Sequence, residues 1–233
     1  MKKSIITLLS FAVLGFVCLN PISAQAEENI NYTAEEEQLL TKLEKEVAEF
    51  EEDTNILDAK PLEQDMKDRT RAKIGSWSWR DGVIALTDGG KQVAFVNSWH
   101  AAIVIPQDYY AVAEAGPDKG VFKTISTEKT NKFLERYPKN QVWQVGVKST
   151  TVQQDWKAGE WAGKQVGKKY NSEILKDIRR TDKFYCSQLV WAAYYYTANY
   201  DLDLLANNIG GTWRIHPKEI LDHEGTAIIY RKN

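Results

Sequence analysis

The sequence predicts an α+β domain in which an antiparallel sheet packs against helices. Short runs with the composition of strands lie mostly before residue 148, and helical patterns dominate after residue 150. A chain that built a parallel sheet would alternate the two patterns instead. Hydrophobic residues make up 43% of the chain and charged residues 27%, which is typical of a soluble globular protein with a substantial core.

The first 26 residues have the organisation of a secretory signal peptide. Lys2 and Lys3 form a basic start, residues 5–19 form an apolar run, and Ala24 and Ala26 occupy the small-residue positions of a cleavage site. An uncleaved membrane anchor is the alternative, but the apolar run is short for a helix that spans a bilayer. We therefore expect a secreted or extracytoplasmic protein, in the cell envelope or periplasm, without stable membrane insertion after cleavage.

Cleavage after residue 26 would leave a single cysteine, Cys186, because Cys18 lies within the signal peptide. A lipoprotein anchored through Cys18 is disfavoured, since Val17 is a poor residue before a lipidated cysteine. The lone cysteine forms no internal disulfide and is either a buried apolar filler or a reactive thiol. Loss of Lys2 and Lys3 changes the formal charge from −2 to −4, so the sequence predicts no nucleic-acid partner.

Residues 27–73 are expected to form an N-terminal helical segment followed by a linker. Thr33 and Glu36 have the spacing of a capping box, which predicts that a helix begins there. The polar stretch 53–71 contains Pro61 and is expected to be the linker. The helix would present an apolar stripe to the main domain, formed by Leu39, Leu40, Leu43, Val47 and Phe50.

The main domain is expected to span residues 74–233 and to open with its strands. Trp77 and Trp79 alternate with serines, as in a half-exposed strand. Turn residues at 88–90 and 106–108 separate the apolar runs that follow. These runs predict strands at 82–86, 93–96, 100–105, 109–115, 121–125 and 141–147, and a last strand at 226–230.

Four segments of the main domain have helical spacing. Pro217 opens the last of them, and Gly225 follows its end. The predicted helices span residues 126–137, 151–166, 186–200 and 215–223. Two of them come directly after the main group of strands, which supports the α+β class.

The loop at 106–108 predicts a hairpin that brings a histidine beside a carboxylate. If Ile105 pairs with Tyr109, His100 faces Glu114 across the two strands, with Cβ atoms about 5 Å apart. A β-bulge would break this pairing. A carboxylate at one ring nitrogen orients a histidine and stabilises its protonated form, as in a catalytic triad. The alternative is a structural ion pair at a sheet edge.

Cys186 stands where the last long helix is expected to begin. Leu189, Val190, Ala193 and Tyr194 give the helical spacing that follows it. The unpaired amides and the positive end of the helix dipole favour a thiolate at this position, and a neighbouring imidazole would favour it further. The alternative is a cysteine buried in a helix–sheet interface.

Four segments in order resemble the YiiX/YaeF-type permuted papain-like amidases, which are related to NlpC-type cell-wall peptidases and to lecithin:retinol acyltransferase-like proteins. The resemblance covers roughly residues 74–230, and the segment Tyr-Cys-Ser at 185–187 is its most specific part. The histidine strand precedes the cysteine helix, as in the permuted branch. The four segments are His100–Ile105, Val112–Ala115 with Gly120 and Val121, Gly167–Asn171, and Phe184–Val190.

The resemblance implies a circularly permuted papain-like (NlpC-like) fold with a nucleophile, Cys186, a base, His100, and an orienting residue, Glu114. It also implies an oxyanion held by backbone amides, including that of Cys186. Tyr170 and Tyr185 stand where the family carries aromatic residues near the site. The helix expected at 33–51 is not part of the family core.

The other chemically active side chains give weaker signals. Most of the eight tryptophans must belong to the core, but Trp99 is a candidate for binding substrate. His216 is the rival base, although Pro217 after it indicates a helix entry, and His223 is expected to be structural. With three histidines and one mature cysteine, the sequence predicts no metal site, and it shows no cofactor motif.

The expected activity is that of an exported cysteine hydrolase, an amidase or peptidase that forms an acyl-enzyme. Cell-wall peptides of peptidoglycan are natural substrates for such an exported enzyme. The first alternative is an acyltransferase or thioesterase that acts on lipid-like acyl groups with the same triad. The second is a non-catalytic module that binds the cell wall. The sequence makes no prediction of oligomeric state.

Overall fold

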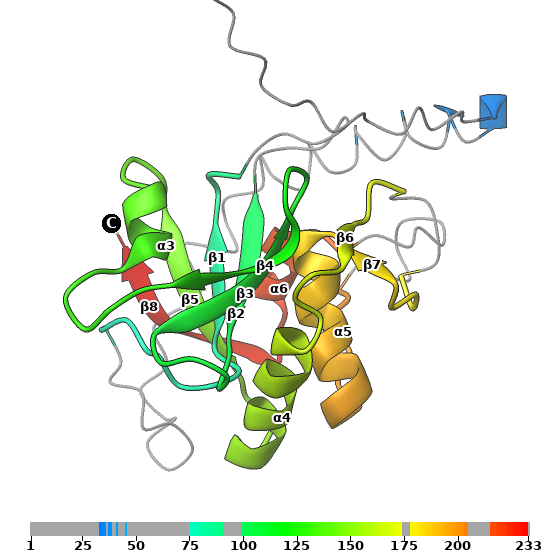
Figure 1. Cartoon of the computed structure of the whole chain (residues 1–233). Helices are drawn as coiled ribbons and strands as arrows, with labels where there is room; N and C mark the ends of the chain where they lie inside the picture. Colours follow the sequence, from blue (N-terminus) through cyan, green and yellow to red (C-terminus); the bar gives the residue numbers. More distant parts are fainter. Residues whose placement is uncertain are drawn as a thin grey trace, which may run out of the picture.

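The computed structural model describes residues 75–90, 99–173, 178–204 and 215–232, together with residues 33–35, 37, 38, 41 and 45 (Figure 1). The predicted signal peptide, the apolar stripe of the N-terminal segment, the linker and the strand at 93–96 lie outside these residues. The Glu37 amide donates to the Thr33 carbonyl over 2.9 Å, but the helix at 33–51 as a whole stays a prediction. In the described part of the chain, no helix is long and apolar enough to cross a membrane.

Six of the described strands form one antiparallel sheet with the spatial order β4-β3-β2-β1-β5-β8. The first four strands pair with their neighbours in the chain, β5 pairs with the other side of β1, and the C-terminal strand pairs with β5. The strands are β1 (Ile84–Thr87), β2 (His100–Val104), β3 (Ala111–Gly116), β4 (Gly120–Ile125), β5 (Val142–Val147) and β8 (Thr226–Lys232).

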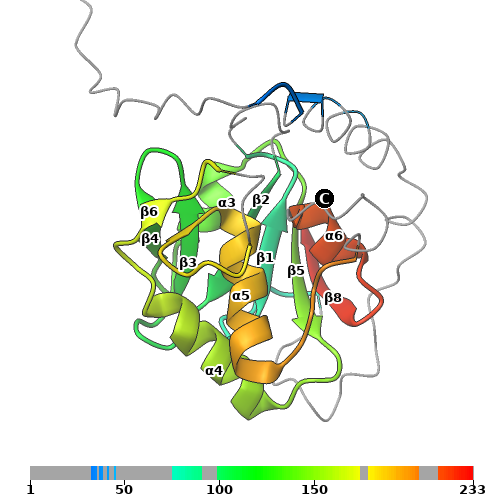
Figure 2. The same cartoon turned by 90° about the vertical axis from the view of Figure 1, so that its right-hand side faces the viewer.

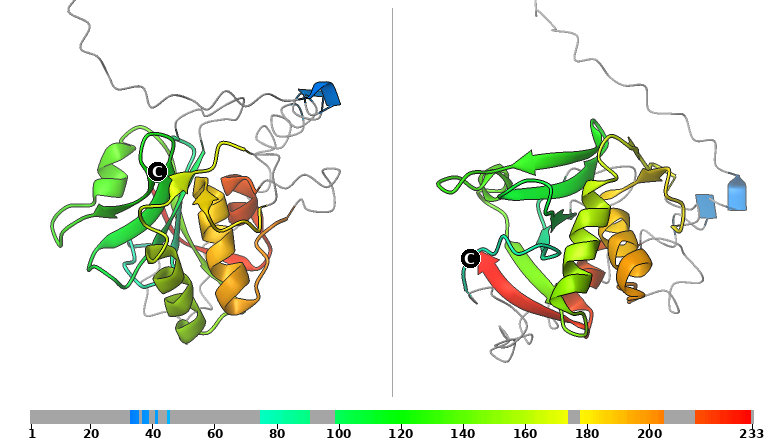
Figure 3. Two further views of the ribbon diagram at one scale, coloured as in Figure 1. Left: turned by 45° about the vertical axis from the view of Figure 1, so that its right-hand side comes forward. Right: turned by 60° about the horizontal axis from the view of Figure 1, so that its bottom comes forward.

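The described helices are α3 (Lys132–Arg136), α4 (Val152–Gly163), α5 (Cys186–Ala198) and α6 (Pro217–Asp222). Figures 2 and 3 show α4 and α5 side by side against one face of the sheet. The start of α4 shows how the sequence sets a helix end. The Thr151 hydroxyl accepts from the Gln154 amide (3.2 Å), and the Gln154 side chain accepts from the Thr151 amide (2.9 Å), which completes a capping box.

Side chains that alternate along the strands build a hydrophobic core on each face of the sheet. Ala101 and Ile103 of β2 belong to the larger core, which they share with Leu189 of α5. Ala102 lies in the smaller core, which it shares with Phe133 of α3. Successive residues of a strand point to opposite faces, so β2 separates a face covered by α4 and α5 from a face covered by α3.

A short parallel pair, β6 (Lys169–Tyr170) and β7 (Lys183–Phe184), connects two of the segments that carry the family resemblance. The Val121 amide at the start of β4 donates to the Lys168 carbonyl, and the Gly167 amide donates to the Val121 carbonyl, each over 2.8 Å. Gly120 permits this approach, since it has a positive φ of 65° and a Cβ there would lie 2.2 Å from the Lys168 oxygen.

The α+β class, the antiparallel sheet and its packing against helices are confirmed. Two of the predicted elements differ from those of the structure. The segment around Trp77 and Trp79 forms no strand, and the two rings instead pack edge to face at 5.5 Å over the smaller core. The helix predicted at 126–137 begins only at Lys132, because Asn131 caps it by accepting from the Leu134 amide over 3.1 Å.

Candidate active site

His100 and Glu114 lie on paired strands, but the register differs by two residues from the one that the sequence predicted. Ala102 pairs with Glu114, so His100 is its diagonal neighbour and does not face it directly. The predicted pairing of residues 105 and 109 is wrong because Tyr110 adopts a left-handed φ of 58° and belongs to a longer turn. A slip of two residues keeps each side chain on its own face, and diagonal neighbours remain within reach of long side chains.

The contact itself therefore survives the change in register. His100 Nε2 lies 2.6 Å from Glu114 Oε2, and the Glu114 side chain is completely buried. The imidazole keeps 12% of its surface exposed. Because the carboxylate occupies Nε2, the ring nitrogen that remains for another partner is Nδ1.

That partner is Cys186, the first residue of α5. The N-cap Tyr185 has an extended backbone, and its amide donates to Gln188 Oε1 over 3.3 Å, which defines where the helix begins. The Cys186 side chain is half-buried at this helix entrance and forms a hydrogen bond with the His100 side chain. Backbone hydrogen bonds from Ala101 and Ser187 also reach the sulfur.

The nucleophile candidate and the histidine come from different sides of the sheet and meet at the start of α5. Cys186 packs against the larger core together with α5. By strand alternation, His100 and Glu114 lie on the face of the smaller core, with α3. His100 is the first residue of β2, so its ring lies at the end of the strand, where the start of α5 approaches it.

The electrostatics of the site favour a thiolate paired with an imidazolium. Burial is the largest single effect and acts against both charges, but the hydrogen bond and positive charge of His100, together with backbone hydrogen bonds, outweigh it and lower the pKa of the Cys186 thiol below its ordinary value. Against the same effect of burial, hydrogen bonds to Cys186 and Glu114 raise the pKa of His100 to about 9. Burial would raise the pKa of Glu114, yet its bonds to His100 and Arg136 lower it to about 2.

Two further residues hold Glu114, and sequence reasoning missed both. Arg136, the last residue of α3, donates from Nη1 to Oε2 (2.9 Å) and from Nη2 to Oε1 (2.7 Å). The Thr124 hydroxyl of β4 donates to Oε1 and accepts from Arg136 Nη2 over 3.0 Å. An arginine at the end of a predicted helix is ordinarily explained by the helix dipole, so nothing in the local sequence indicates a buried partner.

Aromatic rings from α3 and from the residue that follows it pack beside His100. The Phe133 ring is stacked at 6.2 Å from the imidazole, and the Tyr137 ring lies at the same distance. Burial raises the pKa of Tyr137 to about 12, with the negative charges of Glu114 and Cys186 acting in the same direction. The phenol therefore stays neutral and adds no charge to the site.

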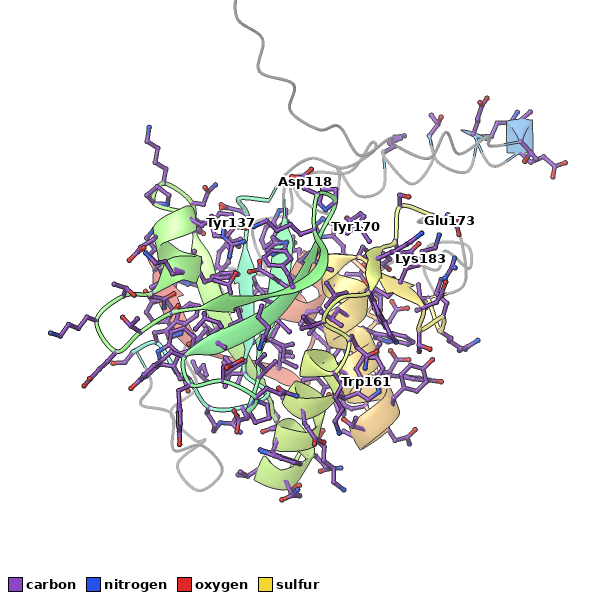
Figure 4. The ribbon with its side chains drawn as sticks, in the orientation of Figure 1. Asp118, Tyr137, Trp161, Tyr170, Glu173 and Lys183 are labelled. Atoms are coloured by element: carbon purple, nitrogen blue, oxygen red, sulfur yellow. The ribbon has the colours of Figure 1, made fainter. Side chains whose placement is uncertain are left out.

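The three candidate substrate-binding residues lie in different surroundings. Trp99 is half-buried beside His100 and stacks on Trp143 with ring centroids 5.3 Å apart. Tyr185 is 4% exposed, and its hydroxyl accepts from the Ile215 amide over 3.0 Å, an arrangement that favours a structural role. Tyr170 is half-buried, and Figure 4 shows it at the same end of the molecule as Tyr137.

The two other histidines cap α6. His216 is its N-cap, buried, and its Nδ1 accepts from the Lys218 amide over 3.1 Å. His223 follows the last residue of the helix and accepts from the Gly225 amide over 2.9 Å. Both positions agree with the structural roles expected for them. Within the described ranges, no group of three or more His, Cys, Asp or Glu side chains is placed to hold a metal ion.

The sequence matches the model of a family described as "Permuted papain-like amidase enzyme, YaeF/YiiX, C92 family" over residues 86–206, more than half of the 233-residue chain. The chain therefore belongs to the permuted papain-like amidases. The matched region contains Cys186, His100 and Glu114. At the level of the family, this supports a cysteine hydrolase of the amidase or peptidase type.

Among solved structures, the chain is similar to one described as the metalloprotein yiiX from Escherichia coli O157:H7. The identity is 15%, the TM-score is 0.43, and the alignment covers 67% of this chain and 99% of that chain. No curated protein was found to match the chain.

Proposed function

We propose that this protein is an exported cysteine hydrolase that cleaves amide bonds with Cys186 as nucleophile, His100 as acid and base, and Glu114 as the orienting carboxylate. One observation carries the proposal. The imidazole of His100 bonds to the Cys186 side chain while its Nε2 lies 2.6 Å from a buried carboxylate. Family membership supports the same class of reaction.

The chemistry follows from the charges of this arrangement. The thiolate of Cys186 attacks the carbonyl carbon of the amide, and the resulting oxyanion would be held by backbone amides at the start of α5. Protonated His100 gives its Nδ1 proton to the amine as the C–N bond breaks, which leaves a thioester on Cys186. Neutral His100 then takes a proton from water, and the hydroxide attacks the thioester. The acid product leaves, and the thiolate–imidazolium pair is restored.

Two features support an amide substrate of the cell wall. The predicted signal peptide would place the enzyme where peptidoglycan is accessible. The family is described as amidases. The same thioester would also be formed by an acyltransferase, which differs only in the group that accepts the acyl chain.

The test is acylation and turnover with two substrate sets, short peptide amides with the sequences of cell-wall stem peptides and lipid-like acyl thioesters. We expect a Cys186 thioester, visible by intact mass, and release of amine from the peptide set. Cys186→Ser should form no acyl-enzyme. Transfer of the acyl group to an added amine or alcohol faster than to water would instead identify an acyltransferase. Absence of acylation from both sets would contradict the enzymatic proposal and favour a binding module.

A further inference from the structure

Both carboxylate oxygens of Glu114 have specific hydrogen-bond partners inside the protein. Oε2 lies 2.6 Å from His100 Nε2 and 2.9 Å from Arg136 Nη1. Oε1 accepts from Arg136 Nη2 over 2.7 Å and from the Thr124 hydroxyl. The carboxylate is thus shared between the imidazole on one side and a two-pronged guanidinium on the other, with none of its side chain exposed to solvent.

A carboxyl group buried in this way would take up a proton if it had no permanent positive partner. His100 alone does not keep the Glu114 carboxyl ionised throughout the proposed reaction, because the imidazole must lose its proton during that reaction. Arg136 is different, since a guanidinium stays protonated at all accessible pH values and its fork matches a carboxylate. It is therefore the partner that keeps Glu114 ionised when the imidazole is neutral.

The guanidinium of Arg136 is itself held in place by its surroundings. Its central carbon lies 5.5 Å from the Tyr137 ring centre, 5.7 Å from that of Phe133 and 6.0 Å from that of Phe122. Aromatic faces attract a guanidinium within about 6 Å. With 35% of its side chain exposed, Arg136 is fixed on three sides and aimed at the carboxylate.

We propose that Arg136, supported by Thr124, is a positioning residue of the active site that keeps Glu114 ionised and directed at His100, and so stabilises the reactive thiolate–imidazolium pair from a distance. This inference rests on the proposed function only for its catalytic consequence. The described groups around His100 are Cys186 from α5, Glu114 from β3, Thr124 from β4, Arg136 from α3, and Tyr137, which follows α3. The site thus balances the two negative charges of Cys186 and Glu114 with the two positive charges of His100 and Arg136, while the phenol stays neutral.

The test measures the pKa of the His100 imidazole by nuclear magnetic resonance in the absence of substrate, so that it does not depend on turnover. The three histidines of the chain are assigned with His216 and His223 variants. Arg136→Met should shift the His100 titration by about 1 pH unit or more, because without the guanidinium the carboxyl of Glu114 competes with the imidazole for one proton. Arg136→Lys should restore much of the wild-type value, since it keeps the charge with fewer donors. Thr124→Val should cause a smaller shift of the His100 titration than Arg136→Met.

Arg80→Met is the matched control, because Arg80 also pairs with a buried carboxylate, Asp155, at 2.5 Å. It should cost comparable stability and leave the His100 titration unchanged. The inference would be overturned if the His100 pKa were unchanged in Arg136→Met, or if it changed equally in Arg80→Met. Arg136 would then have a structural role only. If Arg136→Met does not fold, Arg136→Lys and Thr124→Val test the inference in its place. A His100 titration equal to that of the wild type in both variants would overturn the inference. A shifted titration in a protein without turnover would preserve this inference and contradict the proposed function.

Discussion

Replacing His100 with alanine removes the group that pairs with the Cys186 sulfur, and the structure predicts a large loss of thiol reactivity below neutral pH. In the native site, the hydrogen bond from His100 lowers the pKa of Cys186 against the opposing effect of burial. Without the imidazole, burial disfavours the thiolate, and the smaller effects of the backbone hydrogen bonds from Ala101 and Ser187 are left to oppose it. Only the thiolate reacts with an alkylating reagent such as iodoacetamide.

The size of the effect follows from the population of thiolate. A free thiol with a pKa of about 8.5 is about 0.3% ionised at about pH 6, so full ionisation in the pair raises the reactive population about 300-fold. A stabilised thiolate is a weaker nucleophile, because reactivity decreases with basicity with a coefficient of about 0.4–0.5. The two factors together predict that His100→Ala slows alkylation about 5- to 10-fold at about pH 6, and burial of the unpaired thiol adds to this loss.

The assay is the rate of carbamidomethylation followed by intact mass, in a chain with Cys18→Ser so that Cys186 is the one remaining thiol. His223→Ala is the matched control, because that imidazole bonds to the Gly225 amide next to α6. The control should react at the wild-type rate. A His100→Ala rate within about threefold of the wild-type rate at about pH 6 would refute the reasoning, as would equal slowing by the control.

Three further outcomes are expected. Catalytic rate should decrease as the pH rises through about 9, where His100 loses its proton, and Glu114→Gln should move this limb of the pH profile to lower pH; an unmoved limb would contradict the role of Glu114. At pH values below 6.5, the ordinary pKa of histidine, the raised pKa of His100 stabilises the fold by about 3 kcal/mol. This stabilisation should be lost as the pH rises through about 9, and urea unfolding at several pH values measures it. Asp155→Ala should lower the free energy of unfolding, measured in urea, by about 3–5 kcal/mol. The change leaves the guanidinium of Arg80 without its carboxylate and the Tyr194 hydroxyl without one partner. A decrease below about 1 kcal/mol would contradict this prediction.

The order of strands and helices was predictable because each leaves a local pattern in the sequence. Thr151 and Gln154 have capping-box spacing, and they cap α4. The register of β2 and β3 was not predictable, since it depends on the left-handed conformation of Tyr110, which an aromatic residue seldom adopts. The strand expected at Trp77 failed because alternation with serine is also compatible with an irregular segment packed over an aromatic cluster.

The candidate triad was within reach of the sequence because two independent signals converged on it. A histidine strand and an acidic strand share a hairpin, and Cys186 begins a helix. The two-residue error in register did not separate His100 from Glu114, since it preserved their common face. The role of Arg136 could not be predicted, because its contact with Glu114 depends on how α3 packs on the sheet. No local pattern in the sequence indicates that packing.

The charge state of Cys186 in the resting protein tests the central claim most directly. A thiolate absorbs in the far ultraviolet and a thiol does not, so the difference spectrum between the chain with Cys18→Ser and the same chain with Cys186→Ser reports ionisation during a pH titration. The ion pair with His100 predicts a thiolate signal that is already present at about pH 6 and disappears with His100→Ala. A signal that appears only through about pH 8.5, and is the same in both proteins, would contradict it.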